Sequence, residues 1–208
     1  KVCYTLGKGE IQNEYEELIW NSIPNTALAM NDIEILPEHI RVVMVNECAP
    51  LRNEDDFYGN TDGEYAVSLR SFFSDSEPAH LLARGIYVTN ACKLPKPREG
   101  FTKQQLQESS VILEEELKLF ENLRVIMLMG DVAIRVHTMI ARRNHTARIP
   151  AGSTYRLRSS IWMDGDIRLF PSYIMTGKNL QIERSKRTMI AEDISQMLAY
   201  LETLDSAG

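Results

Sequence analysis

The sequence predicts an α/β fold, specifically a three-layer α/β/α sandwich with a mostly parallel central sheet. Short β-branched and apolar runs that end in polar or glycine-containing turns alternate with stretches whose apolar residues recur at helical spacing. The chain has 208 residues, 44% hydrophobic and 25% charged, an ordinary composition for a globular protein with a sizeable core. A disordered or fibrous protein is therefore excluded, and we expect residues 1–208 to form a single domain.

Four runs rich in Val, Ile, Leu and Met are the expected core strands. Asp164-Gly165 is a strong hairpin signal, and it would join a strand from Thr154 to Met163, as an antiparallel neighbour, to the last run. In chain order, the four runs cover Arg41 to Asn46, Ile86 to Asn90, Arg124 to Met129 and Ile167 to Phe170.

Helices are predicted between and beyond these strands. Thr102 is expected to be the N-cap of one helix, with Gln105 completing a capping box, and Asp131 is expected to cap the next. The predicted helices cover Ile11 to Trp20, Tyr65 to Phe73, Thr102 to Phe120, Asp131 to Arg142 and Ser185 to Leu204.

The composition also bears on location and cofactors. No apolar run approaches the roughly 18 residues that a membrane span needs, and KVCYTLGKGE at the start is too polar for a signal peptide. We therefore expect a cytoplasmic monomer without a membrane partner. Cys3, Cys48 and Cys92 are far apart, without a Cys-x-x-Cys or a histidine at ligand spacing, so neither a disulfide framework nor a metal site is indicated.

Charge is unevenly distributed in a chain whose formal net charge is -6. Residues 1–80 carry 5 basic and 15 acidic side chains, whereas residues 130–190 carry 11 basic and 4 acidic ones. A basic face on an acidic protein is typical of a phosphate-binding surface. A solvated helix and hairpin explain the same pattern equally well.

The stretch Arg41 to Gly59 is the first candidate for a functional site. Its apolar run ends in a turn that presents Glu47, and Glu54 to Asp56 follow. Open α/β sheets bind ligands in the crevice outside the carboxyl ends of their strands. For the acidic triplet a solvated loop is the simpler reading, whereas Glu47 directly follows a run that should be buried.

Taken in order, the strand ends resemble the uracil-DNA glycosylase superfamily, and most closely its thermostable branch, which carries an iron-sulfur cluster. The residues that carry the resemblance are VMVNECAPLRNED, IYVTNACKLPKP, VIMLMGDVAIR and LFPSYIM, followed by an amphipathic helix. The resemblance implies a hydrolase that acts in DNA repair by base excision. In such proteins the base is extruded into a fitted pocket, and a carboxylate positions water or supports the cationic sugar.

The family's site residues carry over by position. Ala49-Pro50 and Glu54-Asp55 match the first motif without a gap; Cys48 then falls on the family's acid, and one inserted residue would place Glu47 there instead. Asn90 matches the asparagine that reads the base edge, although an Asn at a strand end also commonly caps a loop. The candidates for catalysis are Glu47 and Asp55, and those for substrate binding are Cys48, Ala49, Pro50, Tyr58, Asn90, Phe170 and Ser172.

Two departures from the family limit what the resemblance implies. Phe170 replaces the family histidine, and a phenyl ring cannot donate a hydrogen bond to the departing base. Leu94 occupies the place of a cluster cysteine, and no Cys-x-x-Cys precedes the first strand, so no iron-sulfur cluster is expected.

The expected partner is DNA, single- or double-stranded, or a free nucleobase or nucleotide. Three functions stay open: a diverged glycosylase, a catalytically silent binder on the same fold, and a nucleotide or small-molecule enzyme on a flavodoxin-like sheet, which the absence of a Gly-rich phosphate loop disfavours. The candidate nucleic-acid contacts are Pro171, Met175, Lys178, Arg142 and Arg143.

Overall fold

The computed structural model describes residues 4–5, 33–73, 77–177 and 183–206. Their main feature is a five-stranded sheet in the order β4-β3-β5-β7-β6, in which only β6 runs antiparallel to its neighbour. A separate antiparallel pair joins β1 (Tyr4–Thr5) to β2 (Glu34–Ile35). The strands of the large sheet are β3 (Val42–Ala49), β4 (Ile86–Pro95), β5 (Val125–Met129), β6 (Trp162–Asp164) and β7 (Ile167–Ser172).

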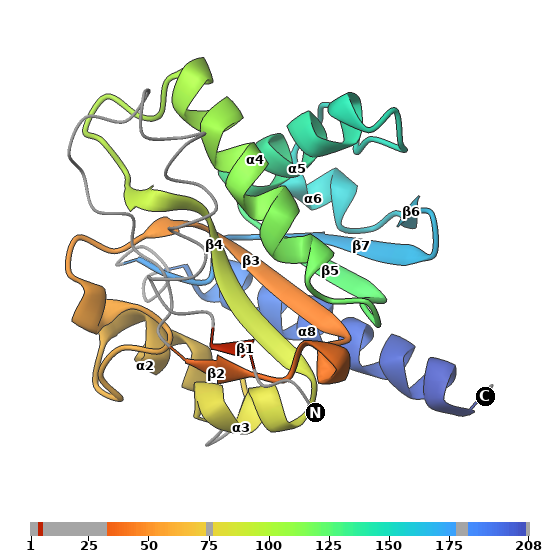
Figure 1. The fold of residues 1–208 in the computed structure, drawn as a ribbon, viewed down its shortest axis with the longest axis horizontal. Coiled ribbons are helices and arrows are strands. Elements are labelled where there is room, and N and C mark those ends of the chain that lie inside the picture. The colour runs from red at the N-terminus through yellow and green to blue at the C-terminus, as the bar shows by residue number, and fades with distance from the viewer. Residues whose placement is uncertain (1–3, 6–32, 74–76, 178–182, 207–208) are drawn as a thin grey trace.

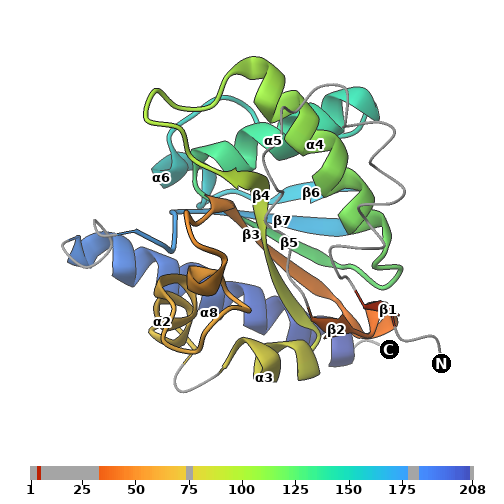
Figure 2. The same ribbon diagram turned by 60° about the vertical axis from the view of Figure 1, so that its left-hand side comes forward.

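Helices cover both faces of this sheet, as the α/β prediction requires (Figures 1 and 2). One apolar core joins the sheet to α4, α5 and α6, and a second joins its other face to α2, α3 and α8. None of the described helices is both long and apolar enough to cross a membrane. The helices are α2 (Glu64–Arg70), α3 (Pro78–Ala83), α4 (Lys103–Lys118), α5 (Asp131–Arg143), α6 (Thr154–Leu157) and α8 (Arg184–Ser206), with short 3-10 turns η1 (Pro37–His39) and η2 (Asn53–Asp55).

Strand register arranges the side chains of the α2/α8 face in rows across the sheet. Successive side chains of a strand point to opposite faces, so every second residue belongs to this face. The row Val88, Met44, Met127 and Phe170 is apolar. The next row toward the carboxyl edge is Asn90, Asn46, Met129 and Ser172. The apolar core on this face is therefore followed, toward the carboxyl edge, by a row that is polar at three of its four positions, with Met129 as the exception.

Most predicted elements are confirmed. All four core strands form at the expected positions, the hairpin at Asp164-Gly165 pairs β6 with β7, and Thr102 and Gln105 form the capping box of α4. Short α3 was not predicted. The helix expected at Ile11 to Trp20, together with Cys3 and Lys178, lies outside the described residues.

Two local predictions are wrong. Residues 154–157 form α6 and not a strand, because Thr154 and Leu157 are both buried at helical spacing, and only Trp162–Asp164 pairs in the hairpin. Asp131 is the first residue inside α5 and not its N-cap. The N-cap is Gly130, and the side chain that accepts from the first turn is Glu47.

Candidate functional site

Two carboxamides form the centre of the candidate site at the carboxyl edge. Asn46 on β3 lies opposite Asn90 on β4, both are fully buried, and Asn46 Nδ2 donates to Asn90 Oδ1 at 3.1 Å. Thr176, after β7, donates to Asn46 Oδ1 at 3.2 Å. Three separate chain segments therefore meet through one chain of hydrogen bonds.

Asp56 completes this chain. Asn90 Nδ2 donates to both carboxylate oxygens of Asp56, at 3.0 and 3.2 Å, and the backbone N–H of Phe57 donates to one of them. Burial raises the pKa of Asp56 above its ordinary value, although the hydrogen bonds from Asn90 and Phe57 act to lower it. Asp56 is thus a buried acid held directly against the predicted base-reading asparagine.

Glu47 lies at the N-terminus of α5. Its Oε1 accepts the backbone N–H of Val132 at 3.1 Å, and its Oε2 lies 3.5 Å from Lys96 Nζ. A carboxylate is favourable there because the first N–H groups of a helix lack backbone partners and carry partial positive charge. Gly130 makes the contact possible, since a Cβ at its φ of +97° would lie 2.5 Å from Glu47 Oε1.

Glu47 and Asn90 lie on opposite faces of the sheet. Glu47 follows Val45 on the face of α4 and α5, whereas Asn46 and Asn90 follow Met44 and Val88 on the face of α2 and α8. The sequence placed both at one edge, and they do share that edge. Strand alternation keeps their side chains apart.

Asp55 lies apart from the buried chain of hydrogen bonds. It forms a two-oxygen ion pair with Arg52, at 2.7 and 2.8 Å, on the exposed turn η2. The hydrogen bond from Arg52 holds the pKa of Asp55 below its ordinary value. Of the acidic triplet, Asp56 and not Asp55 contacts Asn90.

The remaining residues predicted from the first motif are Cys48, Ala49, Pro50 and Tyr58, and of these Cys48 accepts a hydrogen bond from Asn46 Nδ2 through its backbone carbonyl at 3.4 Å. The Tyr58 ring stacks on Tyr87 with centroids 5.9 Å apart, and its hydroxyl accepts the N–H of Val88 at 3.0 Å. Cys48 is buried and burial raises the pKa of its thiol. Ala49 and Pro50 are buried where β3 ends.

The residues of the predicted last motif contribute mainly to packing. Phe170 packs in the α2/α8 core, its ring centroid 6.1 Å from that of Tyr200. Met175 is fully buried in the same core, and Pro171 is buried within β7.

Ser172 donates to Asp193 of α8 at 2.6 Å, and Arg158 donates to the same carboxylate. This cluster is buried, and burial raises the pKa of Asp193. It fixes the end of β7 to α8, one strand beyond Met129 and two strands from Asn46.

Lys93 and Glu116 form a buried ion pair that the sequence reasoning missed. Lys93 Nζ lies 2.5 Å from Glu116 Oε2, and both side chains are at most 3% exposed. Tyr87 and Thr89 donate to the other oxygen of Glu116, so the carboxylate is fully hydrogen-bonded. Lys93 lies beyond the predicted strand end at Asn90, and it is buried because β4 continues to Pro95.

The two predicted arginines have different surroundings. Arg143 is held by Glu114 and Ser110 of α4, whereas Arg142 is exposed. Arg142 lines a groove of about 560 Å³ along α5, together with Arg135 and Lys103. The groove has an apolar floor and also contains Asp131, at the carboxyl edge. Arg135 and Arg142 therefore line the groove along α5, from near the carboxyl edge to the C-terminal end of the helix.

Sequence reasoning selected Asn90 and Glu47 as site residues. It did not select Asn46 or Asp56, which hydrogen-bond to Asn90, or Thr176, which donates to Asn46. A buried polar residue immediately before Glu47 was the signal for Asn46.

Neither the known protein-family models nor the curated proteins contain a match to this chain.

Proposed function

We propose that the protein is a DNA glycosylase-like protein that binds an extruded uracil or another deaminated base at the carboxyl edge of the sheet. The observation that carries this proposal is the buried pair Asn46 and Asn90 on neighbouring strands. A carboxamide offers a donor beside an acceptor, which is also the pattern on the pairing edge of a nucleobase. A base edge can therefore take the place of one amide in this pair.

The groove along α5 supports DNA as the source of the base. Lys103, Arg135 and Arg142 line it, and it reaches Asp131 at the carboxyl edge. Phosphate contacts position a nucleic acid without reading its sequence. The proposed strand follows this groove and presents one base to Asn90, and the protein acts as a monomer in the cytoplasm.

In this proposal Glu47 is the acid for hydrolysis. Its carboxylate would position water or support the cationic sugar as the glycosidic bond breaks. The other proposed function is binding without excision, and two observations favour it: Phe170 packs in the core, and Glu47 already holds the first turn of α5.

Single-stranded oligonucleotides that differ in one base test the proposal. Uracil and hypoxanthine are compared with thymine and cytosine, by fluorescence anisotropy for binding and by alkaline strand breakage for excision. Asn90→Ala should weaken binding of the modified base about tenfold, because it leaves a buried base edge unpaired. Asn53→Ala, an exposed amide on η2, is the matched control.

The outcomes separate the two functions. Excision that Glu47→Gln abolishes supports the glycosylase, and base-selective binding without excision supports the silent binder. Equal affinity for all four oligonucleotides contradicts both. For the groove, the double variant Arg135→Gln/Arg142→Gln should lower the affinity for every oligonucleotide. It should also reduce the salt dependence of binding by the equivalent of about two phosphate contacts. Arg156→Gln, which removes an exposed arginine outside the groove, should change neither.

A further inference from the structure

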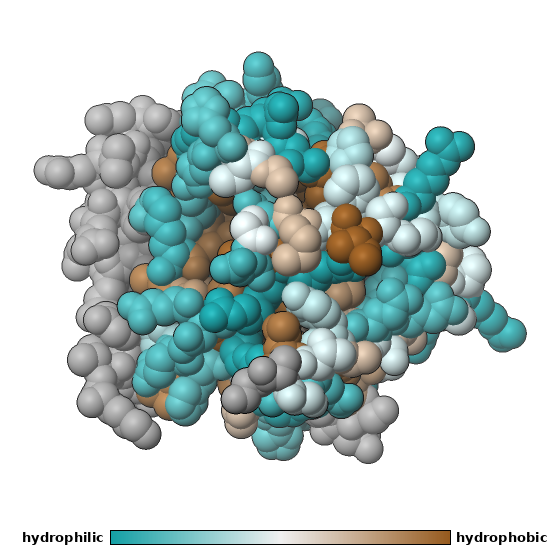
Figure 3. All heavy atoms as spheres, turned by 90° about the vertical axis from the view of Figure 1, so that its right-hand side faces the viewer, coloured by the Kyte–Doolittle hydropathy of each residue, from teal (hydrophilic) through white to brown (hydrophobic). Residues whose placement is uncertain are grey.

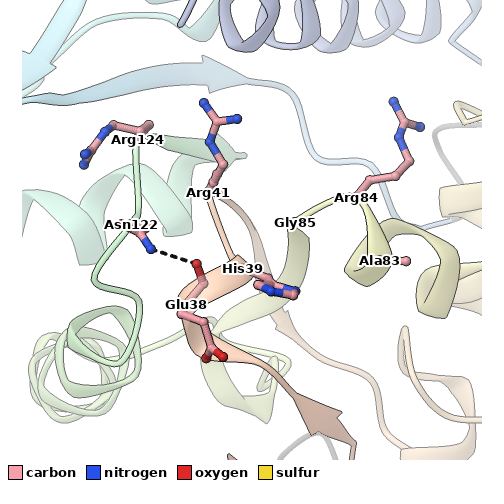
Figure 4. A pocket seen from close by; sticks show the side chains of 8 residues that line it. All are labelled: Glu38, His39, Arg41, Ala83, Arg84, Gly85, Asn122 and Arg124. Atoms are coloured by element: carbon pink, nitrogen blue, oxygen red, sulfur yellow. Dashed lines mark hydrogen bonds between the residues drawn. The ribbon is translucent and has the colours of Figure 1, made fainter. Parts of the chain in front are cut away.

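Three arginines stand in a row at the amino edge of the sheet, away from the site proposed above. Arg84 precedes β4, Arg41 precedes β3 and Arg124 precedes β5, and these are three adjacent strands. All three line one pocket of about 490 Å³, with His39 and Glu38 of η1 (Figure 4). In Figure 4 the carboxylate of Glu38 points away from the arginine side chains.

The backbone fixes the spacing of this row. Arg41 N–H donates to Gly85 O at 2.9 Å, and Arg124 N–H donates to Arg41 O at 2.9 Å. Gly85 and Arg124 lie opposite Arg41 on either side, and neighbouring strands lie about 4.8 Å apart, so the backbones of Gly85 and Arg124 are about 10 Å apart; Arg84 directly precedes Gly85. Gly85, at φ +76°, lets η1 come close, because a Cβ there would lie 2.5 Å from His39 O. The arginines thus project from rigid elements.

Little negative charge balances the row within the described part of the chain. Arg41 pairs with Asp205 near the end of α8, but the Asp205 side chain is 61% exposed, and such a surface pair contributes little to stability. Within the described residues no carboxylate pairs with Arg84 or Arg124, and the Arg124 guanidinium donates to the carbonyl of Leu123. The face of the molecule at this edge is largely hydrophilic (Figure 3).

Simple solvation of surface arginines explains each residue alone. Arg84, for example, is the C-cap of α3, where a cation is favourable. That account does not explain why three arginines from separate segments line one pocket with so little balancing charge. Guanidinium groups bind phosphate oxygens in a two-pronged geometry that a single ammonium cannot reproduce.

We propose that this amino-edge pocket binds linked phosphate groups, with Arg84, Arg41 and Arg124 as their ligands. Among the described residues that line the pocket, Ala83 and Gly85 are the ones without a polar side chain, which favours recognition of the phosphates over an attached base or acyl group. The phosphates belong to a free oligophosphate or to successive positions of a nucleic-acid strand.

Titration with inorganic pyrophosphate tests the site in the full chain. We expect binding by calorimetry in low salt, weaker binding in high salt because of screening, and shifts of the arginine Nε–Hε NMR signals. The double variant Arg84→Gln/Arg124→Gln, which leaves the Arg41 pair with Asp205 intact, should reduce affinity tenfold or more. Arg156→Gln, which removes one exposed arginine on α6, should bind like the wild type.

Two results would overturn the proposal: no pyrophosphate binding by the wild type, or equal binding by the double variant and the wild type. Competition then identifies the source of the phosphates. If a single-stranded oligonucleotide displaces pyrophosphate from the wild type and the double variant binds that oligonucleotide more weakly, the ligand is a nucleic-acid strand. If it does not displace pyrophosphate, the ligand is a free oligophosphate. Because Asn90 and the α5 groove are unchanged in these variants, failure here does not bear on base binding at the carboxyl edge.

Discussion

Gly130→Ala is expected to destabilise the protein in a way that reveals the role of Glu47. Two costs add at this position. A side chain at φ +97° is strained by roughly 1–3 kcal/mol. The new Cβ would also lie 2.5 Å from Glu47 Oε1, which would displace the carboxylate from the N–H of Val132, and loss of such a cap costs roughly 0.5–2 kcal/mol. The free energy of unfolding should therefore fall by about 1.5–5 kcal/mol.

Gly100→Ala is the matched control. Gly100 also has a left-handed conformation, at φ +86°, but no atom lies within 4 Å of a Cβ built there. It should show the strain alone. Urea unfolding followed by circular dichroism gives both values, provided that the dependence on urea concentration is the same for each variant.

A double-mutant cycle isolates the contact with Glu47. In a Glu47→Ala background the clash is absent, so Gly130→Ala should cost no more than Gly100→Ala, with a coupling of roughly 0.5–2 kcal/mol. Equal costs of Gly130→Ala in both backgrounds would show that Glu47 does not hold α5. Glu47→Gln should retain most of the stability, because its amide oxygen can still accept from Val132.

Three further predictions concern buried groups. Burial raises the pKa of Asp56, so the folded state holds the Asp56 proton at pH values above the ordinary pKa of 3.8, where the unfolded state has lost it. The free energy of unfolding therefore falls as the pH rises from 3.8 through the raised pKa. Asp56→Asn should remove this part of the pH dependence, measured by urea unfolding. Lys93→Met leaves Glu116 unpaired and should cost about 3–5 kcal/mol by thermal or urea unfolding, and recovery should follow when Glu116→Gln is added. Phe170→His places an imidazole in the α2/α8 core, so it should lower the free energy of unfolding by roughly 1–3 kcal/mol without raising excision of uracil. A variant that stays stable and gains excision would instead show that the side chain at position 170 lies in the site.

The fold could be predicted because each of its main signals is local. The run Arg124 to Met129 is apolar at every position but the first, and β5 is buried throughout. The hairpin depends on one dipeptide, and the capping box of α4 on two residues three apart. The strand predicted at Thr154 is wrong because Thr154 and Leu157 are both buried and three residues apart, a spacing that places them on one side of a helix but on opposite faces of a strand.

The site was predicted less completely because hydrogen-bond partners come from distant parts of the chain. Asp56 and Asn90 are 34 residues apart, and Thr176 and Asn46 are 130 apart. No pattern in the sequence states which acid of a triplet turns inward. Asp55 and Asp56 are adjacent, but Asp55, the last residue of η2, is only half-buried, whereas Asp56, which follows the turn, is buried.

A bulge beyond Asn90 shows how the carboxyl edge acquires its buried lysine. Cys48 lies opposite Cys92, but the next residue of β3, Ala49, lies opposite Pro95, so β4 carries Lys93 and Leu94 as extra residues. A bulge of this kind locally redirects side chains and is frequent beside active sites. Here Lys93 turns into the protein to meet Glu116. The alignment of the first motif left open whether Glu47 or Cys48 takes the family's acid position, and one residue of shift moves a strand's side chains to the other face. Since Glu47 and Asn90 lie on opposite faces, a base and a sugar that contact both must approach end-on over the carboxyl edge.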